Sequence, residues 1–487
     1  MHPPHSARSP LPAVRPSACP GLLRIVQALD GGICRIKLPG GLLSAAQADA
    51  VAQAAQVHAG GVIEATNRAN VQIRGIQGDH AALIAGLMAA GLGPRQAEGD
   101  DVRNLMLSPA AGLDPLQLLD VRPLAEQILT SLESQPRLHA LSPKFAIQLD
   151  GGEALAMLEH HHDLWLSPVL LDGQLWMRFG LAGCPAHDAA AGAVPLTQAH
   201  CLVLAVLDGF LAQASSDQHR LRDLLRAGVE AADFVAGLDV PGLVLAGQGT
   251  SRLAASDIAA SDIAASDSAA RDRAVGGRDR ASAPAVDTRT STSTTSTTDP
   301  TAPPIGVHAQ RDAGRCMVVA GAPLGRLTPQ QLRELAEIAR QWGDGTLRIT
   351  PWQGVLLPHI DLANAGAVQQ ALGACGLLVD PAQPLASLIA CTGAAGCTKG
   401  QADTKADALR LASLLQTPRA VHLSGCARSC AAAHVAPATL LAVGNDRYDL
   451  YLRDATGLGF GVLRATHITV QEAGTLLDVR PRSNTDD

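Results

Sequence analysis

The chain has 487 residues, more than one domain usually holds, so two or three domains are expected. Hydrophobic residues make up 47% of it and aromatic residues only 2%, so its cores must be built from Leu, Val, Ile and Ala. A net charge of −7 argues against nucleic acid as the main partner. The N-terminus lacks the apolar core of a secretory signal, and the apolar run at 81–93 is too short to span a bilayer. We therefore expect a cytoplasmic protein, away from membranes, whose ten cysteines are reduced thiols or metal ligands.

The first predicted unit alternates strands and helices. Ser44, followed three residues later by Gln47, forms a capping box that opens a helix. Glycines at 60 and 61 end that helix. The expected elements are a strand over 33–38, the helix from Ser44, a strand over 62–73 and a second helix over 81–90.

This unit occurs twice, with an offset of 284 residues. Thr328 and Gln331 repeat the capping box, Gly343 and Gly345 repeat the break, and 346–357 repeats the second strand. An ungapped match across more than thirty residues indicates a duplication.

A second, looser repeat follows each copy. Strands at 164–171 and 174–181 flank Asp172-Gly173, a typical hairpin turn, and strands at 439–443 and 448–453 repeat the arrangement. Between the halves lies a Ser-, Thr-, Asp- and Pro-rich segment predicted to be a disordered linker. The predicted parts are half-domain 1 (15–95), a domain without a cluster (100–246), the linker (247–304), half-domain 2 (305–380) and a cluster-binding domain (385–480).

Four cysteines near the C-terminus carry the strongest chemical signal. Cys391 and Cys397 flank a Gly/Ala loop, and Cys426 and Cys430 follow an apolar run that reads as a strand end. Four thiolates from two loops can hold a [4Fe–4S] cluster, with one cysteine per iron. Zinc is a competing interpretation, although a five-residue gap is long for a zinc pair. Four buried structural cysteines are the other alternative.

The pattern Cys-x5-Cys followed by Cys-x3-Cys resembles the cluster motif of the sulfite and nitrite reductase superfamily. Residues 387–391 and 422–430 are most similar to one branch, the precorrin-3B synthases of aerobic cobalamin synthesis. The resemblance implies an α+β fold with pseudo-twofold symmetry. In that fold two ferredoxin-like half-domains pair, and two α/β domains of the 4Fe-4S type flank them.

The resemblance also points to substrate-binding cations. Sirohaem reductases bind their macrocycle and anionic substrate through arginines and lysines, and guanidinium groups grip carboxylates bidentately. The matching positions here are Arg68 (in 66–72), Arg103 (in 101–104), Lys144 (in 143–145) and Arg348. A lone arginine is more often a solvated surface residue, so the motif context carries this prediction.

One departure from the reductases affects the expected substrate. They place a second lysine two residues after the first, and this chain has Ala146 there. Losing that cation weakens the case for sulfite or nitrite and fits a large organic substrate better.

Histidines and the remaining cysteines leave open questions. His160-His161-His162 could ligate a mononuclear iron, but a polar loop is the simpler interpretation, since consecutive side chains do not converge on one ion. The role of His434 is equally open. The scattered cysteines are expected in the core; they are Cys34, Cys184, Cys201, Cys316 and Cys375.

Three function classes follow. The first is an O2-dependent monooxygenase that converts precorrin-3A to precorrin-3B, with the cluster passing electrons to a second iron, non-haem iron being favoured over sirohaem. The second is a sirohaem-dependent sulfite or nitrite reductase, and the third is a non-catalytic iron–sulfur electron carrier. The sequence has neither a Gly-x-Gly-x-x-Gly dinucleotide motif nor a Walker loop, so electrons should come from outside, from NADH through a reductase or from a ferredoxin.

Overall fold

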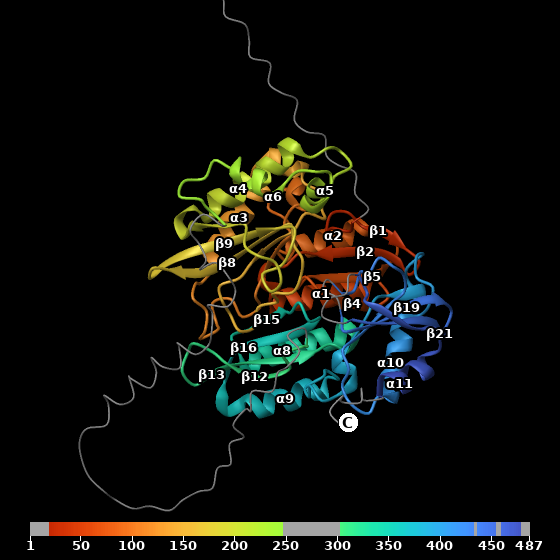
Figure 1. Cartoon of the computed structure of the whole chain (residues 1–487). Coiled ribbons are helices and arrows are strands. Elements are labelled where there is room, and N and C mark those ends of the chain that lie inside the picture. The colour runs from red at the N-terminus through yellow and green to blue at the C-terminus, as the bar shows by residue number, and fades with distance from the viewer. Residues whose placement is uncertain (1–18, 247–301, 433–435, 454–458, 479–487) are drawn as a thin grey trace, which may run out of the picture.

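The computed structural model describes residues 19–246, 302–432, 436–453 and 459–478. Of the linker predicted at 247–304, only residues 302–304 are described, and His434 also lies outside the described residues. The described residues form four sheets, each carrying helices (Figure 1).

The duplicated unit builds two antiparallel five-stranded sheets. The first has the order β1 (Val26–Ala28), β2 (Gly31–Ile36), β5 (Val71–Ile76), β4 (Val62–Ala65), β14 (Arg326–Leu327). The second has the order β12 (Gly306–Ala309), β13 (Arg315–Gly321), β16 (Gly354–Asp361), β15 (Thr346–Ile349), β3 (Leu42–Ser44). Each sheet therefore takes its last strand from the other copy. The helices of the two units are α1 (Ala45–His58), α2 (His80–Ala89), α8 (Pro329–Trp342) and α9 (Ala365–Ala374).

The two copies also share one core. Helices α1 and α8 pack against each other, and both predicted capping boxes are present, at Ser44 with Gln47 and at Thr328 with Gln331. A single apolar cluster runs through both copies, from Leu22 to Leu377. The predicted pairing of the half-domains about a pseudo-twofold axis is confirmed.

The single strands predicted at 62–73 and 346–357 are wrong: each is a hairpin. β4 and β5 are joined by a turn in which the Thr66 hydroxyl accepts the backbone N–H groups of Arg68 (3.3 Å) and Asn70 (3.1 Å), and Ala69 adopts a φ of 55°. The second copy turns in the same way at 350–354, where Gln353 has a φ of 59°. Arg68 consequently lies at a hairpin tip and not within a strand.

The other two sheets share one topology and flank the duplicated pair. The first has the order β6 (Leu105–Leu107), β7 (Ile147–Leu149), β8 (Leu164–Leu171), β9 (Gln174–Leu181), β10 (Gly192–Pro195), β11 (Val244–Leu245). The second has the order β17 (Leu388–Ala390), β18 (Val421–Ser424), β19 (Ala438–Gly444), β20 (Arg447–Leu452), β21 (Val462–Ile468). In each, the first three strands are parallel and the next are antiparallel. The hairpin predicted around Asp172-Gly173 is confirmed.

Helices cover these outer sheets. They are α3 (Arg122–Ser134), α4 (Ala199–Gln213), α5 (Leu221–Arg226), α6 (Ala231–Ala236), α10 (Thr404–Leu414) and α11 (Val470–Asp478). The stretch Leu196–Gln213 is long and apolar enough to cross a membrane, but the α4 side chains of Leu202, Val206 and Phe210 are fully buried in a protein core. Cys201, predicted to be core, is exposed on this helix, because it lies on the face opposite that core.

Candidate functional site

The four cysteines of the sequence motif line one cavity. Cys391 and Cys397 lie on the loop after β17, and Cys426 and Cys430 lie on the loop after β18, so the parallel pairing of these strands brings the two loops to the same edge of the sheet. The cavity has a volume of about 500 Å³. Burial is the largest cause of the raised pKa of Cys430, and the three neighbouring thiols add to it. All four cysteines can therefore lose their protons together only when a positive charge lies among them.

Glycines allow these loops to approach backbone to backbone. A Cβ on Gly400 would lie 2.4 Å from the carbonyl carbon of Gly393, and a Cβ on Gly393 would lie 2.4 Å from the oxygen of Ala402. Gly425 packs against both glycines and donates its N–H to Cys391 Sγ at 3.2 Å. N–H groups directed at a cysteine sulfur are one of the means by which proteins tune iron–sulfur centres.

The spacing of the sulfurs separates a cluster from a single ion. Four ligands of one zinc ion at 2.3 Å would lie about 3.8 Å apart. In the part of the chain that the structure describes, three metal-ligating atoms within 4.8 Å of one another occur at His161, Cys184 and Asp188, and not among the four motif cysteines. No three of the four described motif sulfurs therefore lie within 4.8 Å of one another, a spread wider than one zinc ion needs and compatible with a polynuclear iron–sulfur centre.

The opposite wall of the cavity includes three members of a polar row on the first sheet, namely Arg35, Gln72 and Glu64. Arg35 on β2, Gln72 on β5, Glu64 on β4 and Arg326 on β14 are in register across four strands. With the Gln72 amide turned to accept, its oxygen lies 2.7 and 2.9 Å from two Arg35 nitrogens. Strand alternation directs this row away from the apolar core and towards the cysteines.

Buried charges anchor the middle of this row. Glu64 lies 3.0 Å from Arg326, 3.8 Å from Arg74 and 3.8 Å from Lys405. Burial alone would raise the pKa of Glu64, but these three cations together lower it, so the carboxylate is ionised. Lys405 also donates to the Ala390 carbonyl next to Cys391, which ties the sheet to the cysteine loop.

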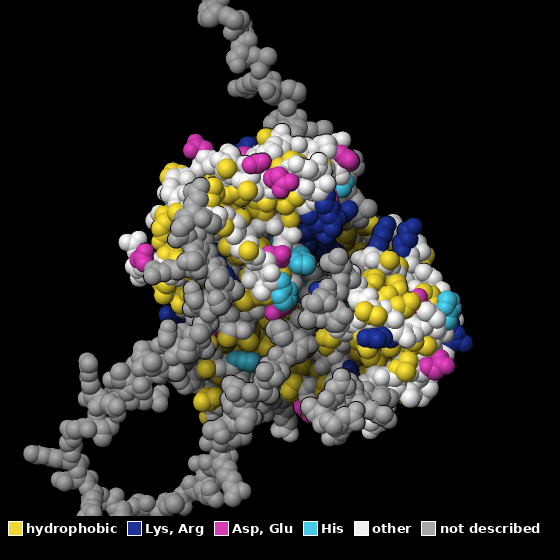
Figure 2. All heavy atoms as spheres, in the orientation of Figure 1, with side chains coloured by type: hydrophobic (Ala, Val, Ile, Leu, Met, Phe, Trp, Pro, Cys, Tyr) yellow, Lys and Arg dark blue, Asp and Glu magenta, His cyan; other side chains and the backbone are white. Residues whose placement is uncertain are grey.

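Other cations of the cavity lack a carboxylate partner. Among the described residues, Arg35, Lys399 and Arg428 line the cavity and make no salt bridge, whereas Arg74 is held bidentately by Asp30 at 2.9 Å. Figure 2 shows Lys and Arg side chains gathered where the lobe with α4–α6 meets the lobe with β19–β21. The cavity therefore combines four thiols with positive charge available to an anion. Sequence reasoning missed Arg35, although its alternation with buried Cys34 and Ile36 was a usable signal.

Arg68 lines a second, much smaller hollow of about 10 Å³, the size of one water molecule. Burial and the neighbouring Arg220 lower the pKa of Arg68 to about 10, so it remains a cation at neutral pH. Ala146 and His162 line the same hollow. The His162 Nδ1 donates to the His160 carbonyl at 2.8 Å, which leaves an Nε2 lone pair, buried and without a partner. Ala146, at the position where the reductases have their second lysine, thus borders a small space between the Arg68 guanidinium and the His162 imidazole.

The other three predicted substrate-binding residues lie elsewhere. Arg103 is buried between Asp100 and Glu133, each 3.5 Å away. Arg348 is buried and donates to two backbone carbonyls of the loop at 109–111. Lys144 is exposed in the turn before β7 and not on a strand. Their contact with substrate remains a prediction, and of the four only Arg68 faces one of the two hollows.

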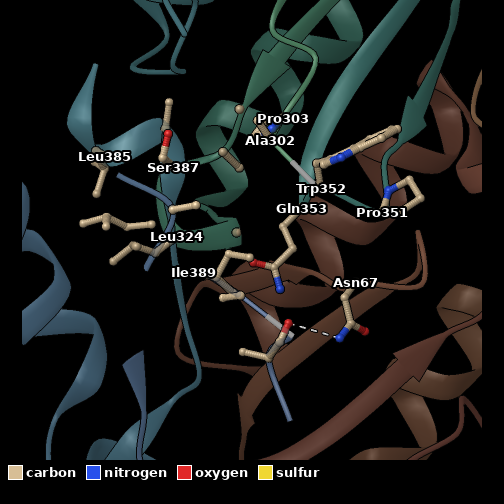
Figure 3. Close-up of a pocket in the computed structure, with 18 of the residues that line it drawn as sticks. Asn67, Ala302, Pro303, Leu324, Pro351, Trp352, Gln353, Leu385, Ser387 and Ile389 are labelled. Carbon is tan, nitrogen blue, oxygen red and sulfur yellow. Dashed lines mark hydrogen bonds between the residues drawn. The ribbon is translucent and has the colours of Figure 1, made fainter. Parts of the chain in front are cut away.

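An apolar crevice adjoins the cysteine cavity (Figure 3). It lies between the turn at 321–325, the Trp352 turn and the start of β17, and it shares Asn67, Gln353 and Ala431 with the cavity. Asn67 donates to the Ala431 carbonyl at 3.1 Å across this boundary. The shared residues form the partition between a charged space and an apolar one.

Two family models match the chain. The nitrite/sulfite reductase ferredoxin-like half domain matches residues 26–90 and 308–375, and the nitrite and sulphite reductase 4Fe-4S domain matches residues 98–230. Together they span more than half of the chain. The first match falls on the two copies of the repeat, and the four motif cysteines lie outside the second.

Curated relatives match most of the chain. The chloroplastic ferredoxin–nitrite reductase of Zea mays is 28% identical over 420 residues, which is 82% of this chain and 68% of that protein. The ferredoxin–nitrite reductase of Synechococcus elongatus is 27% identical, over 84% of this chain and 76% of its own length. A precorrin-3B synthase from Sinorhizobium sp is 25% identical, over 86% of this chain and 79% of its own length.

The solved structure of the Mycobacterium tuberculosis NirA protein has the same fold. It superposes with a TM-score of 0.63, covering 92% of this chain and 79% of that one, at 21% sequence identity. This likeness supports the duplicated architecture described above.

Proposed function

Because the chain belongs to the nitrite and sulfite reductase superfamily, we propose that it is a precorrin-3B synthase, an iron–sulfur monooxygenase of aerobic cobalamin biosynthesis. In this reaction precorrin-3A gains one oxygen atom from O2 and an acetate arm closes a lactone. The other oxygen atom leaves as water, which takes two protons and two electrons from an external donor.

One observation carries the proposal: the cavity beside the four cysteines has room and free cations for a tetrapyrrole, while the chain has Ala146 where the reductases have the second lysine for their oxyanion. A volume of about 500 Å³, part of which the cluster would fill, is within the range of small-molecule sites. Arg35, Lys399 and Arg428 line it from facing walls. Several separated cations suit a macrocycle that carries acetate and propionate arms around its rim.

Protein side chains would orient the substrate and hold charge. Arg35 and Arg428 bind carboxylate arms from opposite sides, and Gln72 keeps the Arg35 fork in place. Arg68 with the His162 lone pair presents one donor and one acceptor to a single small group at the tip of the β4–β5 hairpin. Ala146 leaves room for that group where a lysine would occupy the space.

The cysteine loops fit a [4Fe–4S] cluster held by Cys391, Cys397, Cys426 and Cys430. When bound, the cluster would supply electrons one at a time to a second iron centre, for which we favour non-haem iron over sirohaem. A ferredoxin, or NADH acting through a reductase, is the proposed donor, and the cytoplasm is the proposed compartment.

An isotope experiment tests the proposal. The protein with its cluster is incubated anaerobically with precorrin-3A and a reductant, and is then given a pulse of 18O2. One labelled oxygen atom is expected in the product, with a mass increase that needs both substrate and reductant. A product labelled from water, or no reaction of precorrin-3A by a protein with a full cluster, would refute it.

Ferredoxin-dependent nitrite reduction is the second candidate, because the ferredoxin–nitrite reductases cited above are up to 28% identical to this chain over the aligned residues. The absorption spectrum separates the two, since sirohaem adds intense bands that a cluster alone lacks. Turnover of nitrite or sulfite with reduced ferredoxin, without any reaction of precorrin-3A, would decide for this candidate.

A further inference from the structure

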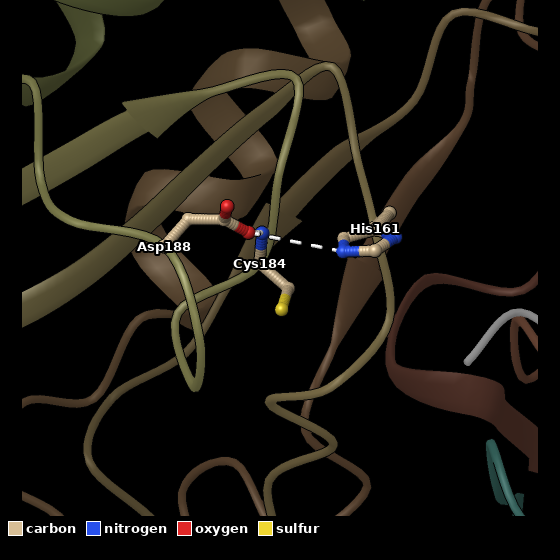
Figure 4. A group of neighbouring side chains, drawn as sticks. All are labelled: His161, Cys184 and Asp188. Carbon is tan, nitrogen blue, oxygen red and sulfur yellow. Dashed lines mark hydrogen bonds and ion pairs between the residues drawn. The ribbon is translucent and has the colours of Figure 1, made fainter. Parts of the chain in front are cut away.

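Outside the cysteine cavity, three side chains of different chemistry converge at the surface of the domain built on β6–β11. The ligating atoms of His161, Cys184 and Asp188 all lie within 4.8 Å of one another (Figure 4). His161 Nε2 is 3.8 Å from the nearer carboxylate oxygen of Asp188. His161 comes from one loop, while Cys184 and Asp188 come from a second loop that faces it.

Backbone hydrogen bonds fix the two loops against each other. The N–H of His162 donates to the Gly183 carbonyl at 2.8 Å, and the N–H of Ala182 donates to the Asp163 carbonyl at 2.8 Å. A third bond joins Ala186 N to the Leu158 carbonyl at 3.2 Å, beyond the cysteine. The separation of His161 from the cysteine loop is therefore set by the backbone before any ligand binds.

The cysteine loop itself is wound around Cys184. The N–H of Cys184 donates to an Asp188 carboxylate oxygen at 2.8 Å, and the N–H of Asp188 donates back to the Cys184 carbonyl at 3.1 Å. A Cβ on Gly183 would lie 2.4 Å from that carboxylate oxygen, so only glycine lets Asp188 fold back here. The carboxylate is thereby held next to the sulfur.

Of the three side chains only that of Cys184 is buried, and its sulfur lies within 4.8 Å of the ligating atoms of the exposed His161 and Asp188. An ion that binds the exposed imidazole and carboxylate would lie at the sulfur and displace its proton to solvent.

We propose that His161, Cys184 and Asp188 bind one divalent transition-metal ion of the zinc type, with water completing its coordination. Imidazole nitrogen, thiolate and carboxylate are the three ligand types that zinc takes in proteins, and three protein ligands with one open position are typical of sites that retain a bound water. Rotation of the exposed His161 side chain can bring its imidazole nitrogen closer to the sulfur and the carboxylate. The site is distinct from the cysteine cavity and does not depend on the reaction proposed above.

Zinc binding to the full chain with its iron–sulfur cluster assembled tests the proposal. Loading the cluster first occupies the four motif cysteines, and zinc is absent from that cluster, so X-ray absorption at the zinc edge reports the new site alone. The protein is dialysed against ZnCl2, and zinc and iron per chain are counted. We expect one zinc, with one sulfur neighbour at about 2.3 Å and nitrogen or oxygen neighbours at about 2.0–2.2 Å.

Matched variants decide between a built site and nonspecific uptake. Cys184→Ser should remove the sulfur neighbour, and His161→Ala, at a side chain that is 54% exposed, should weaken zinc binding at least tenfold without changing the iron content. Cys201→Ser, at an exposed cysteine on α4, should leave zinc unchanged. Four sulfur neighbours, no zinc, or unaltered binding in His161→Ala would each overturn the proposal.

Discussion

Substituting Gly400 by alanine tests whether backbone packing of the cysteine loops, and not the thiols alone, builds the cluster site. The new methyl carbon would lie 2.4 Å from the carbonyl carbon of Gly393 and 2.5 Å from the nitrogen of Ala394. Carbon atoms in contact prefer about 3.5–4.0 Å, so one loop must move by roughly 1 Å. Gly400 N also donates to the Cys397 carbonyl at 2.9 Å, so that movement reaches one of the four proposed cluster ligands.

Overpacking of this kind costs about 1–3 kcal/mol. If the strain is relieved by loosening the loop, Gly400→Ala should weaken cluster retention roughly tenfold, the factor that corresponds to about 1.4 kcal/mol. The assay is iron and sulfide per chain after anaerobic reconstitution, followed by the rate of cluster loss to a chelator. No thiol is removed in this variant, so a loss cannot be assigned to a missing ligand.

Gly366→Ala is the matched control. Gly366 lies in α9, where an added Cβ meets nothing within 4 Å, so this change should stabilise the helix by about 1 kcal/mol and leave the cluster intact. Equal cluster content and equal decay rates in both variants would refute the argument from loop packing.

Three further predictions concern the site and the fold. Cys426→Ala should abolish the cluster, measured as iron and sulfide per chain, and a full complement would show the assignment to be wrong. Arg35→Met should raise KM for the tetrapyrrole about tenfold to a hundredfold with the cluster intact, as loss of a charge-assisted hydrogen bond predicts, whereas Arg340→Met on the surface of α8 should not. Burial and the neighbouring Asp150 raise the pKa of Glu153 to about 8, so the folded chain holds a proton that the unfolded chain releases near pH 4.5. Stability should therefore fall by about 3 kcal/mol between pH 5 and pH 8, and Glu153→Gln should remove that slope in urea unfolding at the two pH values.

The sequence predicted the parts of the molecule that depend on local chemistry or on repetition. Four cysteines in two pairs indicated one site, and the structure brings all four to one cavity. The duplication was readable because capping residues and glycine breaks recur at a fixed offset. The exchange of β3 and β14 between the two sheets could not be predicted from the sequence, since strands of three and two residues have no periodicity of their own.

The sequence was less informative about which cations face the cavity. Arg68 was placed within a strand because the turn that carries it contains neither glycine nor proline; the Thr66 hydroxyl and the positive φ of Ala69 make the turn instead. Arg103 was proposed because residues 101–104 resemble an arginine motif of the reductases, and Arg35 was missed because alternation shows two faces of a strand without showing what covers each. Only the pairing of the sheet with the cysteine loops assigns Arg35 to the cavity and Arg103 to an ion pair.

The duplication also explains why one half of the molecule carries the cysteine cavity and the other does not. Residues 284 positions after Arg35 and Gln72 are Val319 and Leu356, which pair in the second sheet as the first two pair in the first sheet. Leu113 packs with Val319 and Leu356 in a small apolar cluster. The face that carries a polar row in the first sheet therefore carries apolar side chains in the second.

The difference between the two faces gives Arg348 a structural role in the second half. It is the counterpart of Glu64, and its guanidinium binds the carbonyls of Pro109 and Ala111, on the loop that corresponds to the first cysteine loop. A cation that satisfies two buried carbonyls closes the space that the other half keeps open. This face of the second sheet is thus part of the core, whereas the corresponding face of the first sheet, with Arg35, lines the cavity of the four cysteines and remains accessible to a ligand.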